Sequence, residues 1–157
     1  MRVTTTIGAV TMAVASVTDV GLRRKHNEDA LLAAPPVLLV ADGMGGYEAG
    51  DLAALAIVDA FTAAIDAGVP TTLDALRDAL AAADDAVAEV ADGTTRGAGA
   101  TIAGAALIMH EGVPAWVFAF APRGGFVARG VAAEASSTVV TGVGRVRGGL
   151  APRTRWA

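Results

Sequence analysis

An apolar run that ends in a single aspartate constrains this chain more than any other feature. Residues 37–50 read VLLVADGMGGYEAG, so the run stops at Asp42 and three glycines follow within four residues. A short apolar run bounded by turn residues predicts a buried strand. The glycines from Gly43 onward allow a sharp turn and the close approach of another group. We therefore expect Asp42 at the edge of the fold, paired or bound to a metal, because an isolated carboxylate is costly to bury there.

A second polar segment lies a short way upstream. Residues 21–29 read GLRRKHNED, which places three consecutive cations before a histidine, an asparagine and two acids. Taken alone, such a charge run is typical of a solvated loop between two strands. Its position ahead of the strand that ends at Asp42 favours a shared functional site.

The remaining periodicity predicts an α+β fold. We expect strands over residues 13–19, 28–32, 37–42, 100–109 and 113–120, of which the first three follow one another closely. Apolar residues at helical spacing predict two helices, over residues 48–67 and from Thr71 or Thr72 to the Asp92-Gly93 pair. Three strands in quick succession imply a mainly antiparallel sheet rather than repeated βαβ units.

Three motifs stand out in the first two thirds of the chain: Arg24-x-x-Asn27-Glu28-Asp29, the run VADGMGG over residues 40–46, and the run GAGAT over residues 97–101. Together they resemble the motifs of the metal-dependent protein serine/threonine phosphatases of the PPM (PP2C) family. Their order and spacing are similar to those of the family, and the resemblance covers about residues 16–118. It implies the N-terminal part of an α-β-β-α sandwich, with two antiparallel helices packed on a mainly antiparallel sheet, and an incomplete one.

The resemblance also implies a reaction and a set of roles. Two Mg²⁺ or Mn²⁺ ions would activate a water that attacks a phosphoserine or phosphothreonine, without a covalent intermediate. Asp42 would bridge the ions, the Gly43 carbonyl would bind one of them, and Glu28 would hold metal-bound water. Asp29 would support these ligands. Arg24 would bind the substrate phosphate, because a guanidinium matches two phosphate oxygens.

The last quarter of the chain departs from this pattern. Residues 1–116 carry six basic and 15 acidic residues, a formal charge of −9, whereas residues 117–157 carry six arginines and one acid, a charge of +5. No aspartate follows Asp92, although the family completes its metal site with aspartates from its C-terminal half. We therefore divide the chain into an N-terminal extension (1–12), a truncated phosphatase domain (13–120) and a basic tail (121–157). The tail is interpreted as a frameshifted segment, with a natural truncated variant and a partner-binding basic tail as alternatives.

Composition limits the other function classes. The chain has no cysteine, which excludes a cysteine-nucleophile phosphatase, and its net charge of −4 disfavours a general nucleic-acid binder. A P-loop is disfavoured because no helix pattern follows Gly97-x-Gly99. We expect a cytoplasmic protein with no membrane contact, acting on a phosphorylated protein and opposing a serine/threonine kinase. The alternative is a non-catalytic pseudophosphatase fragment that acts as a binding module.

Overall fold

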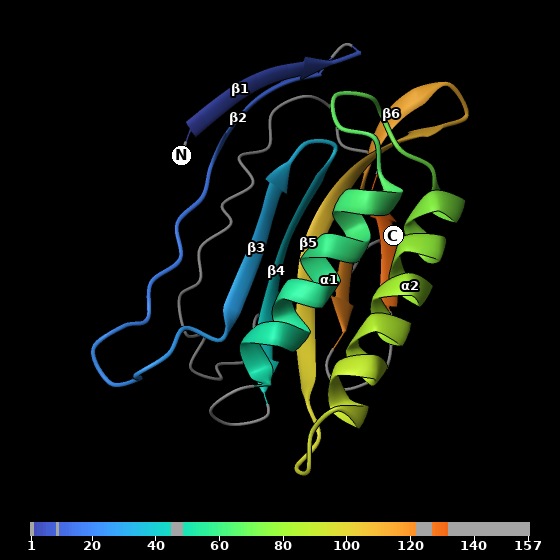
Figure 1. Cartoon of the computed structure of the whole chain (residues 1–157). Coiled ribbons are helices and arrows are strands. Elements are labelled where there is room, and N and C mark those ends of the chain that lie inside the picture. The colour runs from blue at the N-terminus through green and yellow to red at the C-terminus, as the bar shows by residue number, and fades with distance from the viewer. Residues whose placement is uncertain (1, 9, 45–48, 122–126, 132–157) are drawn as a thin grey trace, which may run out of the picture.

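The structure is a computed structural model that describes residues 2–8, 10–44, 49–121 and 127–131. These residues form an α+β fold in which two helices lie side by side across one face of a sheet (Figure 1). This arrangement confirms the predicted fold class. No helix in the described ranges is long and apolar enough to cross a membrane.

The main sheet is antiparallel and has the strand order β3-β4-β5-β6-β7. Its strands are β3 (Asp29–Ala34), β4 (Val37–Met44), β5 (Gly99–His110), β6 (Val113–Ala121) and β7 (Val127–Val131). Each strand pairs with the next one in sequence, and the two helices are inserted between β4 and β5. Strand β4 is therefore a central strand, in keeping with the apolar run that predicted it.

The N-terminal residues form a separate hairpin. Strand β1 (Arg2–Ile7) pairs antiparallel with β2 (Val10–Ala15), and the two make their own two-stranded sheet. Gly8 lies between them with a φ of 60°, a value that glycine adopts readily. The segment 1–12, interpreted from sequence as an extension, thus contains all of β1. The strand predicted over 13–19 ends at Ala15, because its pairing partner is β1 rather than β3.

The two helices begin and end close to their predicted limits. Helix α1 spans Gly50–Ala64, and α2 spans Leu73–Asp92. Thr72 is the N-cap of α2, and its hydroxyl accepts a hydrogen bond of 3.1 Å from the backbone N–H of Ala75. This cap stabilises the helix end because the first turn otherwise leaves its N–H groups without partners.

The core lies between the helices and the sheet. Side chains alternate across a strand, so every second residue of β4 faces the helices. One buried cluster joins strands β4 to β6 with both helices; it includes Val37, Leu39, Ala41, Ile57, Phe61, Leu76, Ala79, Ile102, Ala106, Ile108 and Val117. Many of these side chains are small, which lets the two helices lie close to the strands. Asp42 lies near the C-terminal end of β4, beyond this core.

Part of the basic tail is structured. Strand β7 pairs with β6 over five residue pairs, from Trp116–Val131 to Phe120–Val127. The tail predicted to begin at residue 121 therefore contributes one strand to the main sheet. The rest of the predicted tail, residues 122–126 and 132–157, lies outside the described residues.

Candidate functional site

The three sequence motifs meet on neighbouring strands at one end of the main sheet. In the antiparallel register, Asp42 on β4 lies opposite Asp29 on β3 and opposite Thr101 on β5. Directly opposed residues in an antiparallel sheet project from the same face. Asp42, Asp29 and Thr101 therefore share one face, and Asp42 is exposed while the preceding Ala41 is fully buried. This placement agrees with the expectation of a carboxylate at the edge of the fold, although β4 continues two residues further, to Met44.

Gly43 fixes the geometry of this end of the sheet. Its N–H donates a 3.0 Å hydrogen bond to the backbone carbonyl of Glu28. A Cβ at residue 43 would lie 1.9 Å from the carbonyl oxygen of Gly50, the first residue of α1, so no other residue fits there without movement. Glycine is required here because two backbones approach closely. Gly43 thus brings the end of β4, the start of α1 and the segment before β3 together.

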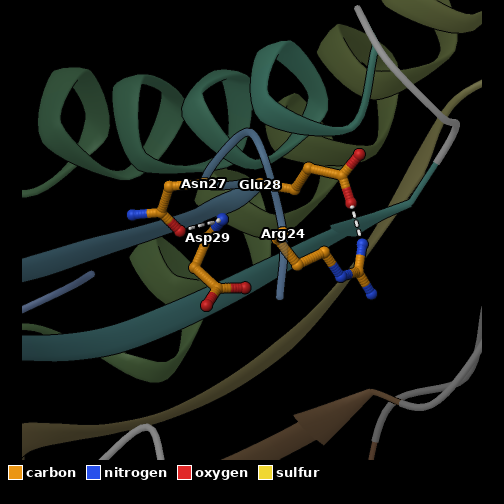
Figure 2. A network of polar contacts seen from close by, with 4 residues as sticks. All are labelled: Arg24, Asn27, Glu28 and Asp29. Atoms are coloured by element: carbon orange, nitrogen blue, oxygen red, sulfur yellow. Dashed lines mark hydrogen bonds and ion pairs between the residues drawn. The ribbon is translucent and has the colours of Figure 1, made fainter. Parts of the chain in front are cut away.

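Glu28 and Arg24 form an ion pair beside this junction. Arg24 Nη1 lies 2.6 Å from Glu28 Oε2, as Figure 2 shows. The Glu28 side chain is 15% exposed and the Arg24 side chain 66% exposed. The carboxylate is therefore set into the protein, while the guanidinium reaches it from the solvent side. The Glu28 carboxyl carbon also lies 3.3 Å from the position that a Cβ on Gly50 would take.

Asn27 holds the acidic segment in place. Its side-chain oxygen accepts a 3.1 Å hydrogen bond from the backbone N–H of Asp29, and its amide nitrogen donates a 2.7 Å bond to Thr18 Oγ1. This bond from the N–H of Asp29 to the side chain two residues earlier is an Asx-turn, which holds the backbone in a defined turn ahead of β3. Asn27 thereby links the loop after β2 to the start of β3.

The pKa of the Asp29 carboxyl group is raised by its surroundings. Partial burial raises its pKa, and the charge of Asp42, a side-chain hydrogen bond with Asp42 and the charge of Glu28 raise it further. The nearby Arg24 guanidinium acts in the opposite direction. Two carboxylates that face each other across a strand pair repel, which adds to the effect of burial in raising the pKa of Asp29.

The predicted metal ligands are only partly brought together. The carboxylates of Glu28 and Asp29 point in different directions (Figure 2), and Asp42 shares the face of Asp29 rather than that of Glu28. Within the described ranges, no three Asp, Glu, His or Cys side chains converge in a way that could hold a metal ion. The donor chemistry suits a hard cation such as Mg²⁺ or Mn²⁺, because all candidates are oxygen ligands. An ion held by Asp29 and Asp42 would keep most of its ligands as water.

Sequence reasoning missed the role of Gly50. The glycines of residues 43–46 attracted attention because they follow Asp42, whereas Gly50 lies further along, at the start of a helix. The contact between Gly43 and Gly50 depends on how α1 packs against β4. The sequence offers one indication of this contact: a glycine stands at the first position of the helix, where no turn requires it.

Comparison with solved structures supports the family resemblance. The chain matches the Mycobacterium tuberculosis serine/threonine phosphatase PstP/Ppp with a TM-score of 0.54 and 25% identity, over 69% of this chain and 49% of that one. It matches PppA of Pseudomonas aeruginosa, described as a key regulatory component of T6SS, with a TM-score of 0.50 and 30% identity, over 73% of this chain and 54% of that one.

A third match is to the S. agalactiae serine/threonine phosphatase, whose 24% identity and TM-score of 0.50 concern the fold alone. No protein-family model and no curated protein matches the sequence. The chain spans about half the length of the solved structures that it matches. The described N-terminal part of this chain therefore shares the fold of solved serine/threonine phosphatases, and Asp29, Asp42 and Thr101, one from each of the three motifs that resemble the PPM (PP2C) family, lie opposite one another on β3, β4 and β5.

Proposed function

We propose that this chain supplies the N-terminal side of the active site of a metal-dependent protein serine/threonine phosphatase. The observation that supports this function best is the meeting of Asp42, Asp29 and Thr101 on one face, beside the Gly43 junction. The substrate would be a phosphoserine or phosphothreonine in a protein, and the chain would oppose a serine/threonine kinase in the cytoplasm.

We assign cation binding and phosphate binding to different residues of the site. Asp42 and the Gly43 carbonyl would hold Mg²⁺ or Mn²⁺, and Glu28 would orient water bound to the ion. Asp29 would support Asp42 from the neighbouring strand, where the two side chains already interact. Arg24, whose side chain is largely exposed, would bind two oxygens of the phosphate. When bound, the metal supplies a water of lowered pKa that attacks phosphorus.

A non-catalytic function is the second candidate. It is favoured because the described residues do not bring three acids to one point, and because the sequence after residue 116 holds one acid, Glu134. Such a pseudophosphatase would bind a phosphorylated partner through Arg24 without hydrolysing it. We also propose that residues 121–157 do not complete the metal site, since the ligands that the family would require there are aspartates.

One experiment separates the two functions. The full chain is incubated with a phosphothreonine peptide and Mn²⁺, and released phosphate is compared between the wild type and Asp42→Asn. Mn²⁺-dependent release that the substitution abolishes would support the phosphatase. Absence of release, combined with peptide binding that is lost in Arg24→Gln, would support the binding module. Release that is unchanged in Asp42→Asn would refute the role of Asp42 and with it the proposed site.

A further inference from the structure

Residues 18–27 form a closed loop between β2 and β3, the 18–27 loop, which is held together by side-chain hydrogen bonds. Asn27 Nδ2 donates a 2.7 Å bond to Thr18 Oγ1, which joins the two ends of the loop. Asp19 Oδ1 accepts a 2.8 Å bond from the backbone N–H of Gly21, whose φ of 73° allows a tight turn. A loop with tied ends presents its tip in a defined orientation, and such loops frequently carry function.

The tip of the 18–27 loop carries an apolar side chain next to three cations. Leu22 is fully exposed, and no part of its side chain is covered by the protein. Arg23, Arg24 and Lys25 follow it, and all three are exposed. Among the described residues, neither Arg23 nor Lys25 takes part in an ion pair, unlike Arg24. The charges of Arg23 and Lys25 are therefore available to an anion that approaches from outside.

This concentration of positive charge is exceptional in its part of the chain. Residues 1–116 carry six basic and 15 acidic residues, and half of the basic ones stand at positions 23–25. A protein with net negative charge repels an acidic ligand, except where its cations gather. The 18–27 loop also leads directly into β3, where Asp29 lies opposite Asp42. The loop is therefore complementary in charge to an acidic partner and adjoins the candidate site.

We propose that the 18–27 loop selects phosphoprotein substrates in which acidic and apolar residues flank the phosphorylated residue. The inference rests on the proposed function, in which Arg24 binds the phosphate. Arg23 and Lys25 flank Arg24 in sequence, and neighbouring Cα atoms of a peptide are about 3.8 Å apart. Carboxylates close to the phosphorylated residue therefore come within reach of Arg23 or Lys25, and an aliphatic side chain of the peptide covers Leu22.

Peptide binding without turnover tests this selectivity. The full chain is titrated by fluorescence anisotropy, in the presence of EDTA, with two labelled phosphothreonine peptides. Glutamate and leucine flank the phosphothreonine in one peptide, and serine and glycine flank it in the other. We expect the wild type to bind the acidic peptide about five- to tenfold more tightly, the gain that two exposed ion pairs and one apolar contact support. The double variant Arg23→Gln/Lys25→Gln should lose most of this preference, and Leu22→Ser should reduce it about threefold.

Arg77→Gln and Val69→Ser are the matched controls. The Arg77 side chain is 71% exposed and Val69 is 50% exposed, so both are surface residues of the same kinds. They lie near the beginning of α2, where Thr71 pairs with Ile108, whereas the candidate site adjoins Thr101 at the other end of β5. Both controls should keep the preference of the wild type for the acidic peptide. Circular dichroism of each variant verifies that the fold is retained.

The outcomes distinguish this inference from the proposed function. Equal affinity of the wild type for the two peptides, no binding of either, or an equal loss of preference in Arg77→Gln would overturn the selectivity of the loop. The phosphate role of Arg24 is measured separately, by comparing phosphorylated and unphosphorylated forms of the acidic peptide. If Arg24→Gln distinguishes these forms as well as the wild type does, the phosphate role and the placement of the substrate are both wrong. Binding to phosphatidylserine vesicles that is lost in the double variant, without any preference between the peptides, would identify a membrane-binding loop instead and overturn the inference.

Discussion

Replacing Gly43 with alanine tests whether the contact between β4 and α1 holds the site together. The added Cβ would lie 1.9 Å from the carbonyl oxygen of Gly50 and 2.7 Å from that of Glu28. Both are backbone atoms, so either α1 or the segment before β3 must move. Overpacking costs about 1–3 kcal/mol, and weakening the Gly43 hydrogen bond to Glu28 costs about 1 kcal/mol more. We therefore expect Gly43→Ala to lower the free energy of unfolding by about 2–4 kcal/mol.

The measurement is urea denaturation followed by circular dichroism, with Gly93→Ala as the matched control. Gly93 follows α2 with a φ of −73°, and the nearest atom to its added Cβ, the Val90 carbonyl oxygen, lies at 3.4 Å. Alanine at a compatible position stabilises a protein by about 0.4–1 kcal/mol through the unfolded state. If Gly43→Ala unfolds within about 1 kcal/mol of Gly93→Ala, the contact with α1 is not the constraint described above.

Three further substitutions test other parts of the fold. Asp29→Asn removes a carboxyl group whose pKa is raised above 3.8, so the favourable contribution of protonated Asp29 is present below that value and lost as the pH rises through the raised pKa. The variant should unfold at about 2 °C above the wild type at pH 7, and the difference should shrink in thermal melts as the pH falls through the raised pKa of Asp29; a lower melting temperature at pH 7 would contradict the repulsion from Asp42. Thr72→Ala removes the acceptor for the Ala75 N–H and should cost about 1 kcal/mol in urea denaturation, whereas Thr72→Ser should cost much less. Phe61→Ala empties a core position that is 4% exposed and should cost about 3–5 kcal/mol; a loss below about 2 kcal/mol would show that Phe61 is not a packing centre.

Local chemistry allowed most of the fold to be predicted from the sequence. The cap at Thr72 and the end of α2 at Asp92 were both predicted, because each helix end depends only on residues within about one turn of it. The N-terminal strand was misplaced, because whether residues 13–19 are extended depends on a partner. Pairing with β1 covers residues 10–15 and leaves residues 16–19 outside any strand. Alternation alone gives no information about where pairing stops.

The sequence predicted that the candidate residues lie near one another, but it did not predict the directions of their side chains. The motif placed Glu28 and Asp29 near Asp42, and the register shows that Asp29 is the residue opposite it. Neighbouring residues in extended chain point to opposite sides, so a shift of one residue in pairing would exchange Glu28 and Asp29. The Gly43 N–H bond to the Glu28 carbonyl fixes this register, and it depends on packing against α1 that the sequence does not display.

The Asp29–Asp42 pair links the stability of this chain to its proposed function. Two acids opposed across strands destabilise the fold at neutral pH, and the pKa of Asp29 is raised first by its partial burial and then by the charge of Asp42. A divalent cation held between them would remove the repulsion and stabilise the native state by mass action. If the Asp29–Asp42 pair bound no cation, added Mn²⁺ would not stabilise the native state. Asp29→Asn should therefore separate the two properties. It relieves the repulsion in the cation-free chain and at the same time removes the carboxylate that would support Asp42 at the cation site, so that added Mn²⁺ raises the melting temperature of the variant less than that of the wild type.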